Sequence, residues 1–232
     1  MAKTYEAMIK KESTTESGWR FLDLENKKQT GDLEKKIIFF HKKNDCKVFN
    51  FTCSLGNEGV STIIANLMNN VAEKKSDKTF LVIDTNFHHP ELHIIFNVSL
   101  ETGLTDILHG GINAQDAIQR TKAPNISILT CGSAFKEYAG KIEQEKLIEV
   151  VNGFRDHYDY IFLDSAPVLS SPDSLSTANA SDLTFMVIQA FKVRREVAEK
   201  AKTVLVDNEC LIGGVVLNNT IQVIPGWLYK IL

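Results

Sequence analysis

The sequence lacks a marked excess of charge of either sign. Its 232 residues include 26 lysines and arginines and 29 aspartates and glutamates, so the formal net charge at pH 7 is −3. The two signs are interspersed along the chain and do not gather into the basic patch that marks nucleic-acid-binding proteins. We therefore expect no nucleic-acid partner.

Paired cysteines are also absent. None of the four cysteines forms a CxxC pair with another. Two of them fall in apolar, strand-like runs, where a reduced thiol behaves as a small hydrophobic side chain. We expect reduced thiols in a reducing compartment. The four positions are Cys46, Cys53, Cys131 and Cys210.

Long apolar runs are missing as well. No run approaches the roughly 20 residues that cross a bilayer as a helix. The opening MAKTYEAMIKKES has no apolar segment of the kind found in signal peptides. From these two absences we expect a cytoplasmic protein.

The chain, with 44% hydrophobic residues, is long and apolar enough to bury one substantial core. Residues 1–45 are rich in Lys, Glu, Ser and Thr, and we expect them to form a partly flexible N-terminal arm. Within this arm, the apolar cluster at 37–40 favours a strand or helix at the edge of the domain, with a contact for self-association as the alternative. We expect one α/β domain over 46–220 and a C-terminal tail over 221–232.

Short runs of β-branched and aromatic residues begin at residue 47, and helical patterns separate them. Most of these runs are apolar on both faces, as strands of a covered parallel sheet must be. The alternation predicts a doubly wound α/β domain, with a mainly parallel sheet and helices on both of its faces. The expected strands span 47–53, 80–84, 126–130, 160–164, 183–189 and 211–218. The expected helices span 61–73, 91–96, 141–154 and 194–206.

Three polar loops follow strands of this sheet: SLGNEGVST, DTNFHHPELH and DSAPVLSSPD. Ligands of such sheets bind at the carboxyl ends of the strands, so we expect the loops to meet at one crevice. In a phosphate-binding loop, glycines let backbone N–H groups and a helix N-terminus hold phosphate, and a Ser or Thr hydroxyl holds Mg²⁺. The first loop offers Gly56, Gly59, Ser61 and Thr62, but Val60 stands where such loops carry a lysine.

The three loops resemble the Walker A, Walker A′ and Walker B elements of the bacterial tyrosine autokinases (BY-kinases). These kinases are relatives of the MinD and ParA ATPases and form the cytoplasmic half of polysaccharide chain-length and export systems. They read PGEGKST, LVIDADLRRPxxH and YDxVIIDTPPVL; this chain reads GNEGVST, LVIDTNFHHPELH and YDYIFLDSAPVL. GLTDILHGG, GGVVLNN and the N-terminal MAKTYEAMIKKES are also similar to family segments. The resemblance covers most of residues 47–220.

The resemblance implies a P-loop fold that binds ATP or ADP with Mg²⁺. Ser61, Asp84 and Asp164 match the family's metal-organising positions, and the two aspartates would be the catalytic residues of an active enzyme. The implied nucleotide-binding positions are Gly56, Glu58, Gly59, Ser61, Thr62 and Asn218. The alternative is that these residues serve the fold alone, with Ser61 capping a helix, the aspartates bonding loop backbone and Asn218 ending a strand in a turn.

Two departures from the family pattern affect the chemistry. Val60 replaces the Walker A lysine, and Asn86 replaces the second aspartate of Walker A′, which in the family helps to activate the attacking hydroxyl. Losing one preorganised charge costs about 10²–10³ in rate, and phosphoryl transfer depends almost wholly on positioning and such charges. We therefore expect little turnover, and ATP binding that is weak or lost.

Other departures agree with this expectation. The family's Arg-Arg in Walker A′ is His88-His89, its tyrosine-rich C-terminal cluster is reduced to Tyr229, and its ExxRxxR oligomerisation motif has no clear match in GDLEKKIIFF. His88, His89 and His93 raise the question of zinc, but HHPELH lacks the spacing of HExxH and Pro90 interrupts any helix there. We expect no zinc.

The sequence thus predicts a cytoplasmic BY-kinase-like pseudokinase that regulates or scaffolds exopolysaccharide biosynthesis and export. Its expected partner is a chain-length-determinant membrane protein or an intact tyrosine autokinase. The first alternative is a slow ATP-dependent autokinase or ATPase, in which a lysine from elsewhere replaces the missing one. The second is a MinD-like positioning protein at the inner face of the membrane with GWLYKIL as its tip, although packing of so short a segment against the core or a partner is favoured.

Overall fold

The computed structural model describes residues 12–14, 20–22, 27–74 and 77–218. The predicted C-terminal tail, with Tyr229 and the GWLYKIL segment, lies outside the described residues. Most of the predicted arm before residue 27 lies outside them too. The described residues therefore comprise the α/β part of the chain and two short strands before it.

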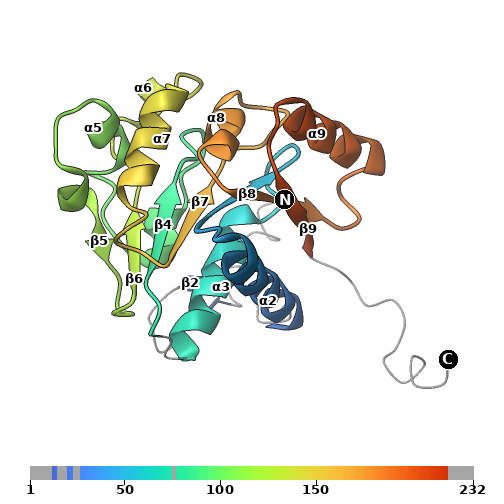
Figure 1. Cartoon of the computed structure of the whole chain (residues 1–232), viewed down its shortest axis with the longest axis horizontal. Helices are drawn as coiled ribbons and strands as arrows, with labels where there is room; N and C mark the ends of the chain where they lie inside the picture. The colour runs from blue at the N-terminus through green and yellow to red at the C-terminus, as the bar shows by residue number, and fades with distance from the viewer. Residues whose placement is uncertain (1–11, 15–19, 23–26, 75–76, 219–232) are drawn as a thin grey trace.

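A seven-stranded sheet forms the centre of the molecule, in the order β5-β6-β4-β7-β3-β8-β9 (Figure 1). All its strand pairs are parallel except β5 with β6, which is antiparallel. This confirms the predicted doubly wound, mainly parallel sheet, and each expected strand is present. The strands are β3 (Val48–Cys53), β4 (Phe80–Asp84), β5 (Gln119–Arg120), β6 (Ile126–Leu129), β7 (Tyr160–Asp164), β8 (Leu183–Gln189) and β9 (Ile212–Asn218). A separate antiparallel pair is formed by β1 (Glu12–Thr14) and β2 (Arg20–Leu22).

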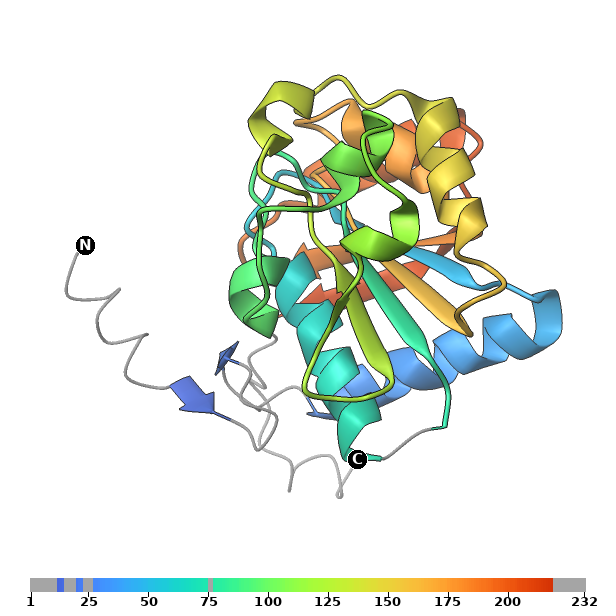
Figure 2. The same ribbon diagram turned by 90° about the vertical axis from the view of Figure 1, so that its left-hand side faces the viewer.

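Helices cover both faces of the sheet, as the side view in Figure 2 shows. α2 and α3 pack on one face, and α5, α7, α8 and α9 pack on the other. The expected helices correspond to α3, α4, α7 and α9, whereas α2, α5, α6 and α8 were not expected. The helices are α2 (Lys27–Asn44), α3 (Val60–Glu73), α4 (Leu92–Phe96), α5 (Leu104–Leu108), η2 (Ala114–Ala117), α6 (Phe135–Tyr138), α7 (Gln144–Gly153), α8 (Asp173–Asn179) and α9 (Arg195–Asp207).

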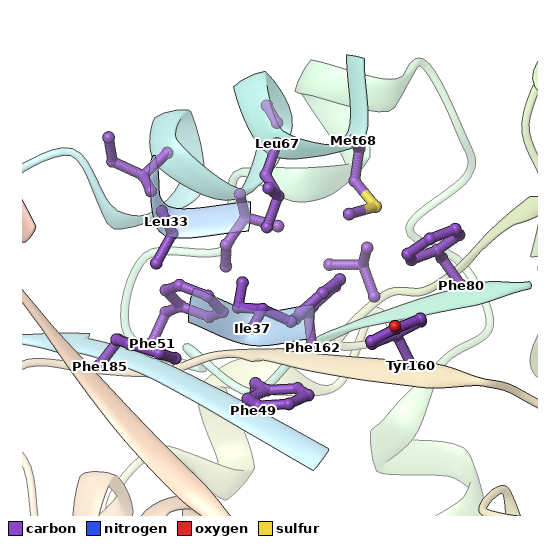
Figure 3. Close-up of a cluster of buried hydrophobic side chains, with 14 of the residues drawn as sticks. Leu33, Ile37, Phe49, Phe51, Leu67, Met68, Phe80, Tyr160, Phe162 and Phe185 are labelled. Atoms are coloured by element: carbon purple, nitrogen blue, oxygen red, sulfur yellow. The ribbon is translucent and has the colours of Figure 1, made fainter. Parts of the chain in front are cut away.

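Aromatic side chains from four neighbouring strands form the core between the sheet and the helices α2 and α3 (Figure 3). Alternate residues of a strand point to the same face, so each strand contributes one or two rings. Neighbouring ring centroids lie 5.1 to 6.4 Å apart, at distances typical of favourable aromatic pairs. The rings belong to Phe49, Phe51, Phe80, Tyr160, Phe162 and Phe185.

α2 takes the place of part of the arm expected over residues 1–45. The helix packs against α3, and its Leu33 and Ile37 are buried over the aromatic core. These two residues are at positions i and i+4, which lie on one face of a helix. The glutamate and the two lysines between them obscure this pattern in the sequence. The cluster at 37–40 belongs to this helix, as the prediction of a strand or helix requires, but the helix covers the inner strands of the sheet and does not lie at the edge of the domain.

The strand register brings the three polar loops to one edge of the sheet. Phe51 of β3 and Asp84 of β4 each lie opposite Asp164 of β7, and Cys53 of β3 lies opposite Val187 of β8. Because these strands are parallel, the loops that follow them leave the sheet side by side. We call the three loops, residues 54–62, 84–93 and 164–173, the strand-end site.

Candidate functional site

The loop from Ser54 to Gly59 joins β3 to α3 and turns where glycine is required. Gly56 and Gly59 have φ angles of 111° and 89°, which residues with side chains rarely adopt. A Cβ atom on Gly59 would also lie 2.2 Å from Nδ2 of Asn218. α3 then begins at Val60 without a side-chain cap, so the N–H groups of its first turn remain available to an anion.

Glu58 braces this loop from inside. Its side chain is buried, and Oε1 accepts hydrogen bonds from the Ser54 N–H (2.9 Å), the Ser54 hydroxyl (2.6 Å) and the Leu55 N–H (2.8 Å). Oε2 is buried as well and has no hydrogen-bond partner among the described residues. The carboxylate therefore closes the loop on itself, and its contact with a nucleotide stays a prediction.

Asn218, at the end of β9, also holds the loop between β3 and α3, although β8 lies between β9 and β3 in the sheet. Its buried side chain donates a hydrogen bond from Nδ2 to the Glu58 carbonyl (2.9 Å). The side chain thus positions the backbone next to Gly59. Contact of Asn218 with a nucleotide base stays a prediction.

Val60 lies where phosphate-binding loops carry their lysine. Its side chain is buried in the same apolar cluster as Ile63 and Ile64 of α3. The next two residues, Ser61 and Thr62, keep their hydroxyls in the first turn of α3, with Ser61 buried and Thr62 half-buried. Residues 60–62 therefore offer N–H and hydroxyl groups to a phosphate, but no positive charge.

Asp84 and Asp164 are buried carboxylates at the ends of neighbouring strands. Asp84 accepts hydrogen bonds from the N–H groups of Asn86 (3.1 Å) and Leu92 (3.3 Å), whereas neither carboxylate oxygen of Asp164 has a hydrogen-bond partner in the described part of the chain. Burial raises the pKa of Asp84 to about 7. Burial, and then the charge of Asp84, raises the pKa of Asp164 well above its usual value, while the nearby Ser61 hydroxyl lowers it.

The unpartnered oxygens of Asp164 fit a metal ion. A buried charge is costly unless it is paired or coordinates a metal, and Mg²⁺ binds through one or two carboxylates together with water and phosphate oxygens. Asp164, Asp84 and the Ser61 hydroxyl offer this set of oxygen donors. Across the described residues no group of three or more His, Cys, Asp and Glu side chains is placed to hold a metal. A Mg²⁺ ion would therefore take its remaining ligands from water or phosphate.

Asn86 and His88 lie in the loop after β4, at the positions where the BY-kinases that the sequence resembles carry an aspartate and an arginine. The Asn86 amide cannot take up a proton as a carboxylate does. Nε2 of His88 lies 3.0 Å from Oγ of Ser171 and 3.7 Å from Oδ2 of Asp173. Asp173 is buried and also accepts two backbone N–H groups from the segment between α6 and α7. These contacts join the loop after β4 to the loop after β7.

The histidines considered for zinc have different surroundings. His88 contacts Ser171, His89 is exposed, and Nδ1 of His93 is buried without a hydrogen-bond partner in the described chain. Burial lowers the pKa of His93, which favours its neutral form. Within the described part of the chain, the three side chains do not form a group that could hold a metal ion.

The sequence does not predict one side chain that contacts the loop between β3 and α3. Lys192, in the turn after β8, donates a hydrogen bond from Nζ to the carbonyl of Asn57 (2.9 Å). No motif marks it, because the two residues are far apart in the chain. The only signal is topological: β8 is a neighbour of β3, so the turn after β8 lies beside the loop after β3.

Known proteins share this architecture, although no protein-family model matches the chain. The putative tyrosine-protein kinase CapB of Staphylococcus aureus is 28% identical over 186 residues, which cover 80% of this chain and 81% of CapB. The kinase domain of the Escherichia coli tyrosine kinase ETK matches with a TM-score of 0.75, at 20% identity, over 84% of this chain and 76% of that one. The septum site-determining protein MinD of Pyrococcus horikoshii, solved as a complex with Mg-ADP, matches with a TM-score of 0.65, at 23% identity, over 79% of this chain and 76% of MinD.

Proposed function

We propose that this chain, which belongs to the bacterial tyrosine kinase family, is a non-catalytic member that regulates or scaffolds exopolysaccharide biosynthesis and export. In this role the kinase fold serves as a binding module. The proposed partner is a chain-length-determinant membrane protein or an intact tyrosine autokinase, and any phosphoryl transfer is carried out by the latter.

The buried side chain of Val60 is the observation that carries this proposal. Phosphoryl transfer depends on cations that neutralise the phosphate charge, and the position that supplies one from the loop is apolar and packed into the core. Asn86 removes a carboxylate from the same site. Each lost charge lowers the rate by about 10²–10³, so the two together leave little turnover.

In this proposal the binding of ATP or ADP is weak or lost. The first-turn N–H groups of α3 would hold phosphate, and Ser61, Asp84 and Asp164 would hold Mg²⁺, which neutralises phosphate charge when it is bound. A charge-assisted hydrogen bond contributes about 1.5–3 kcal/mol. Without the lysine, affinity should be lower than that of an intact kinase by about 10- to 100-fold.

No helix of the described residues is both long and apolar enough to cross a membrane. In the proposal, contact with the inner face of a membrane comes through the membrane-protein partner. Cytoplasmic location likewise belongs to the proposal.

Incubation of the purified chain with radiolabelled ATP and Mg²⁺ tests the proposed loss of phosphoryl transfer. We expect no label on tyrosine, while an intact bacterial tyrosine kinase labels itself under the same conditions. Tyrosine labelling that disappears in the variant Asp164→Asn would overturn the proposal, because it would show that the strand-end site itself transfers phosphate.

A slow autokinase or ATPase is the second candidate. The observation that favours it is the pair Asp84 and Asp164, which keeps an oxygen donor set for Mg²⁺. This candidate requires bound ATP. Calorimetric titration that shows no binding of ATP or ADP at millimolar concentration would eliminate it.

A further inference from the structure

We propose, on the basis of the weak nucleotide binding in the proposed function, that Lys192 supplies the positive charge that the loop lost at Val60. Lys192 then binds the phosphate chain of a ligand at the strand-end site. The ligand class is a magnesium-bound polyphosphate, which includes nucleoside diphosphates and triphosphates as well as inorganic pyrophosphate.

The topology places Lys192 beside the loop. β8 pairs in parallel with β3 as far as Cys53 opposite Val187, so both strands end at the same edge of the sheet. The turn after β8 brings Nζ of Lys192 to 2.9 Å from the carbonyl oxygen of Asn57. The ammonium group therefore contacts the loop just before α3 begins.

The backbone at both ends of this contact adopts a conformation that is unfavourable for residues with side chains. Asn57 has φ of 54° and Phe191 has φ of 62°, and they are two of the five non-glycine residues with positive φ in the described chain. Asparagine tolerates this conformation, but phenylalanine does so rarely. The Phe191 side chain is 77% exposed, so its burial does not offset the strain. Strain of this kind concentrates at binding sites, and here it occurs at Asn57 and next to Lys192.

The charge of Lys192 is available to an anion. An ammonium group has three N–H donors, and one of them meets the neutral carbonyl of Asn57. No ion pair found among the described residues includes Lys192. Lys192 is also the one lysine or arginine that hydrogen-bonds to residues 54–62 within the described chain.

The rest of the site selects the ligand class. The first-turn N–H groups of α3 and the Lys192 ammonium favour an anion. In the same site, both carboxylate oxygens of Asp164 are buried without a hydrogen-bond partner among the described residues, and Asp84 lies opposite Asp164, so a metal ion would satisfy these oxygens. A polyphosphate with Mg²⁺ fits both sets of groups. The metal ion would bind the two carboxylates, and the phosphate would accept hydrogen bonds from the N–H groups of α3 and from the Lys192 ammonium.

Titration calorimetry with three forms of the full chain tests Lys192: the wild type, Lys192→Met and Lys202→Met. Lys202 is exposed on α9, so its substitution removes the same charge without the loss of a contact to the loop. Each form is titrated with ADP and, separately, with inorganic pyrophosphate, both with Mg²⁺. The thermal unfolding temperature of each variant shows that it is folded, and Lys192→Arg tests whether a restored charge restores binding.

We expect the wild type to bind both ligands, and Lys192→Met to bind each of them about 10- to 100-fold more weakly. Lys202→Met should stay within about twofold of the wild type. Unchanged binding by Lys192→Met, or no binding of either ligand by the wild type, would overturn the assignment. A loss for ADP alone would also overturn it, since it would place Lys192 at the base or ribose. None of these results decides whether the chain transfers phosphate to tyrosine, so the proposed loss of phosphoryl transfer stands or falls separately in the labelling assay.

Discussion

In the strand-end site, the residues that hold the loop in shape differ from the residues at which charged groups are missing. Val60 and Asn86 remove a cation and a carboxylate, while Glu58 and Asn218 hold the loop in shape through hydrogen bonds to its own backbone. The loop therefore keeps its conformation without the lysine. Binding of phosphate and transfer of phosphate are then separable, and each can be tested with substitutions at one position.

A lysine at position 60 should strengthen nucleotide binding. We expect Val60→Lys to bind Mg-ADP about 10-fold or more tightly than the wild type, because it adds a charge-assisted hydrogen bond to phosphate. Val60→Met has a similar length and no charge, and it should bind as the wild type does. Calorimetric titration measures both. Equal affinity of the two variants would show that residue 60 does not face the phosphate.

The buried aspartates should give the protein an unusual dependence of stability on pH. The pKa of Asp84 is about 7 in the folded protein, above its ordinary value of 3.8, so the folded state binds this proton more tightly than the unfolded state does. The stabilisation is fully present below about pH 4 and is lost as the pH rises through about 7. One such group changes the free energy of unfolding by at most about 1.4 kcal/mol per pH unit.

Urea unfolding between pH 4 and pH 8 measures this dependence. We expect the free energy of unfolding of the wild type to fall with rising pH relative to that of Asp84→Asn, in which the titrating group is gone. Asp116→Asn removes an exposed aspartate and should leave the wild-type slope unchanged. Parallel curves for the wild type and Asp84→Asn would contradict the burial of an ionisable carboxylate here.

At the scale of elements, α2 covers the aromatic core, yet its sequence pattern did not predict a helix. Its buried residues Leu33 and Ile37 cover the aromatic core, while Phe39 on the same helix is 54% exposed. The strands were predictable because they are continuous apolar runs. α2 was not, because few of its residues face the core. α8 is short and rich in serine and threonine, and β5 has two residues, so neither produces a periodic pattern.

Truncation on the buried face of α2 should therefore destabilise the whole domain. We expect Ile37→Ala to lower the free energy of unfolding by about 2–5 kcal/mol, since it removes buried methyl groups and leaves a cavity. Phe39→Ala, on the exposed face of the same helix, should change it by about 0.5 kcal/mol. Urea denaturation measures both variants. If the two variants lost similar amounts of stability, α2 would not pack on the core as described.

At the scale of the whole molecule, the parallel sheet assembles the site from segments far apart in the chain. That Asp84 and Asp164 would meet was predictable, because parallel strands place their carboxyl ends together. The inward turn of the Glu58 side chain and the contact of Lys192 with Asn57 were not predictable. They depend on the path of individual loops and on side-chain rotamers, which leave no periodic trace in the sequence.

Binding at this site should stabilise the entire fold. A ligand that binds only the folded state raises the free energy of unfolding, by about 1.4 kcal/mol at ten times its dissociation constant. We expect Mg-ADP to raise the thermal unfolding temperature at pH 8, where Asp84 is ionised, and EDTA to reverse the rise. Asp164→Asn should lose most of this response. A response that is independent of Mg²⁺ would show that the carboxylates do not hold the metal.

The central claim is that the chain keeps the kinase fold without the chemistry of phosphoryl transfer. Its most direct measurement is the phosphotyrosine content, by mass spectrometry, of the wild type and of Val60→Lys/Asn86→Asp after incubation with ATP and Mg²⁺. We expect none in the wild type and a measurable amount in the double variant, which regains both lost charges. Phosphotyrosine in the wild type at the level of the double variant would contradict the claim.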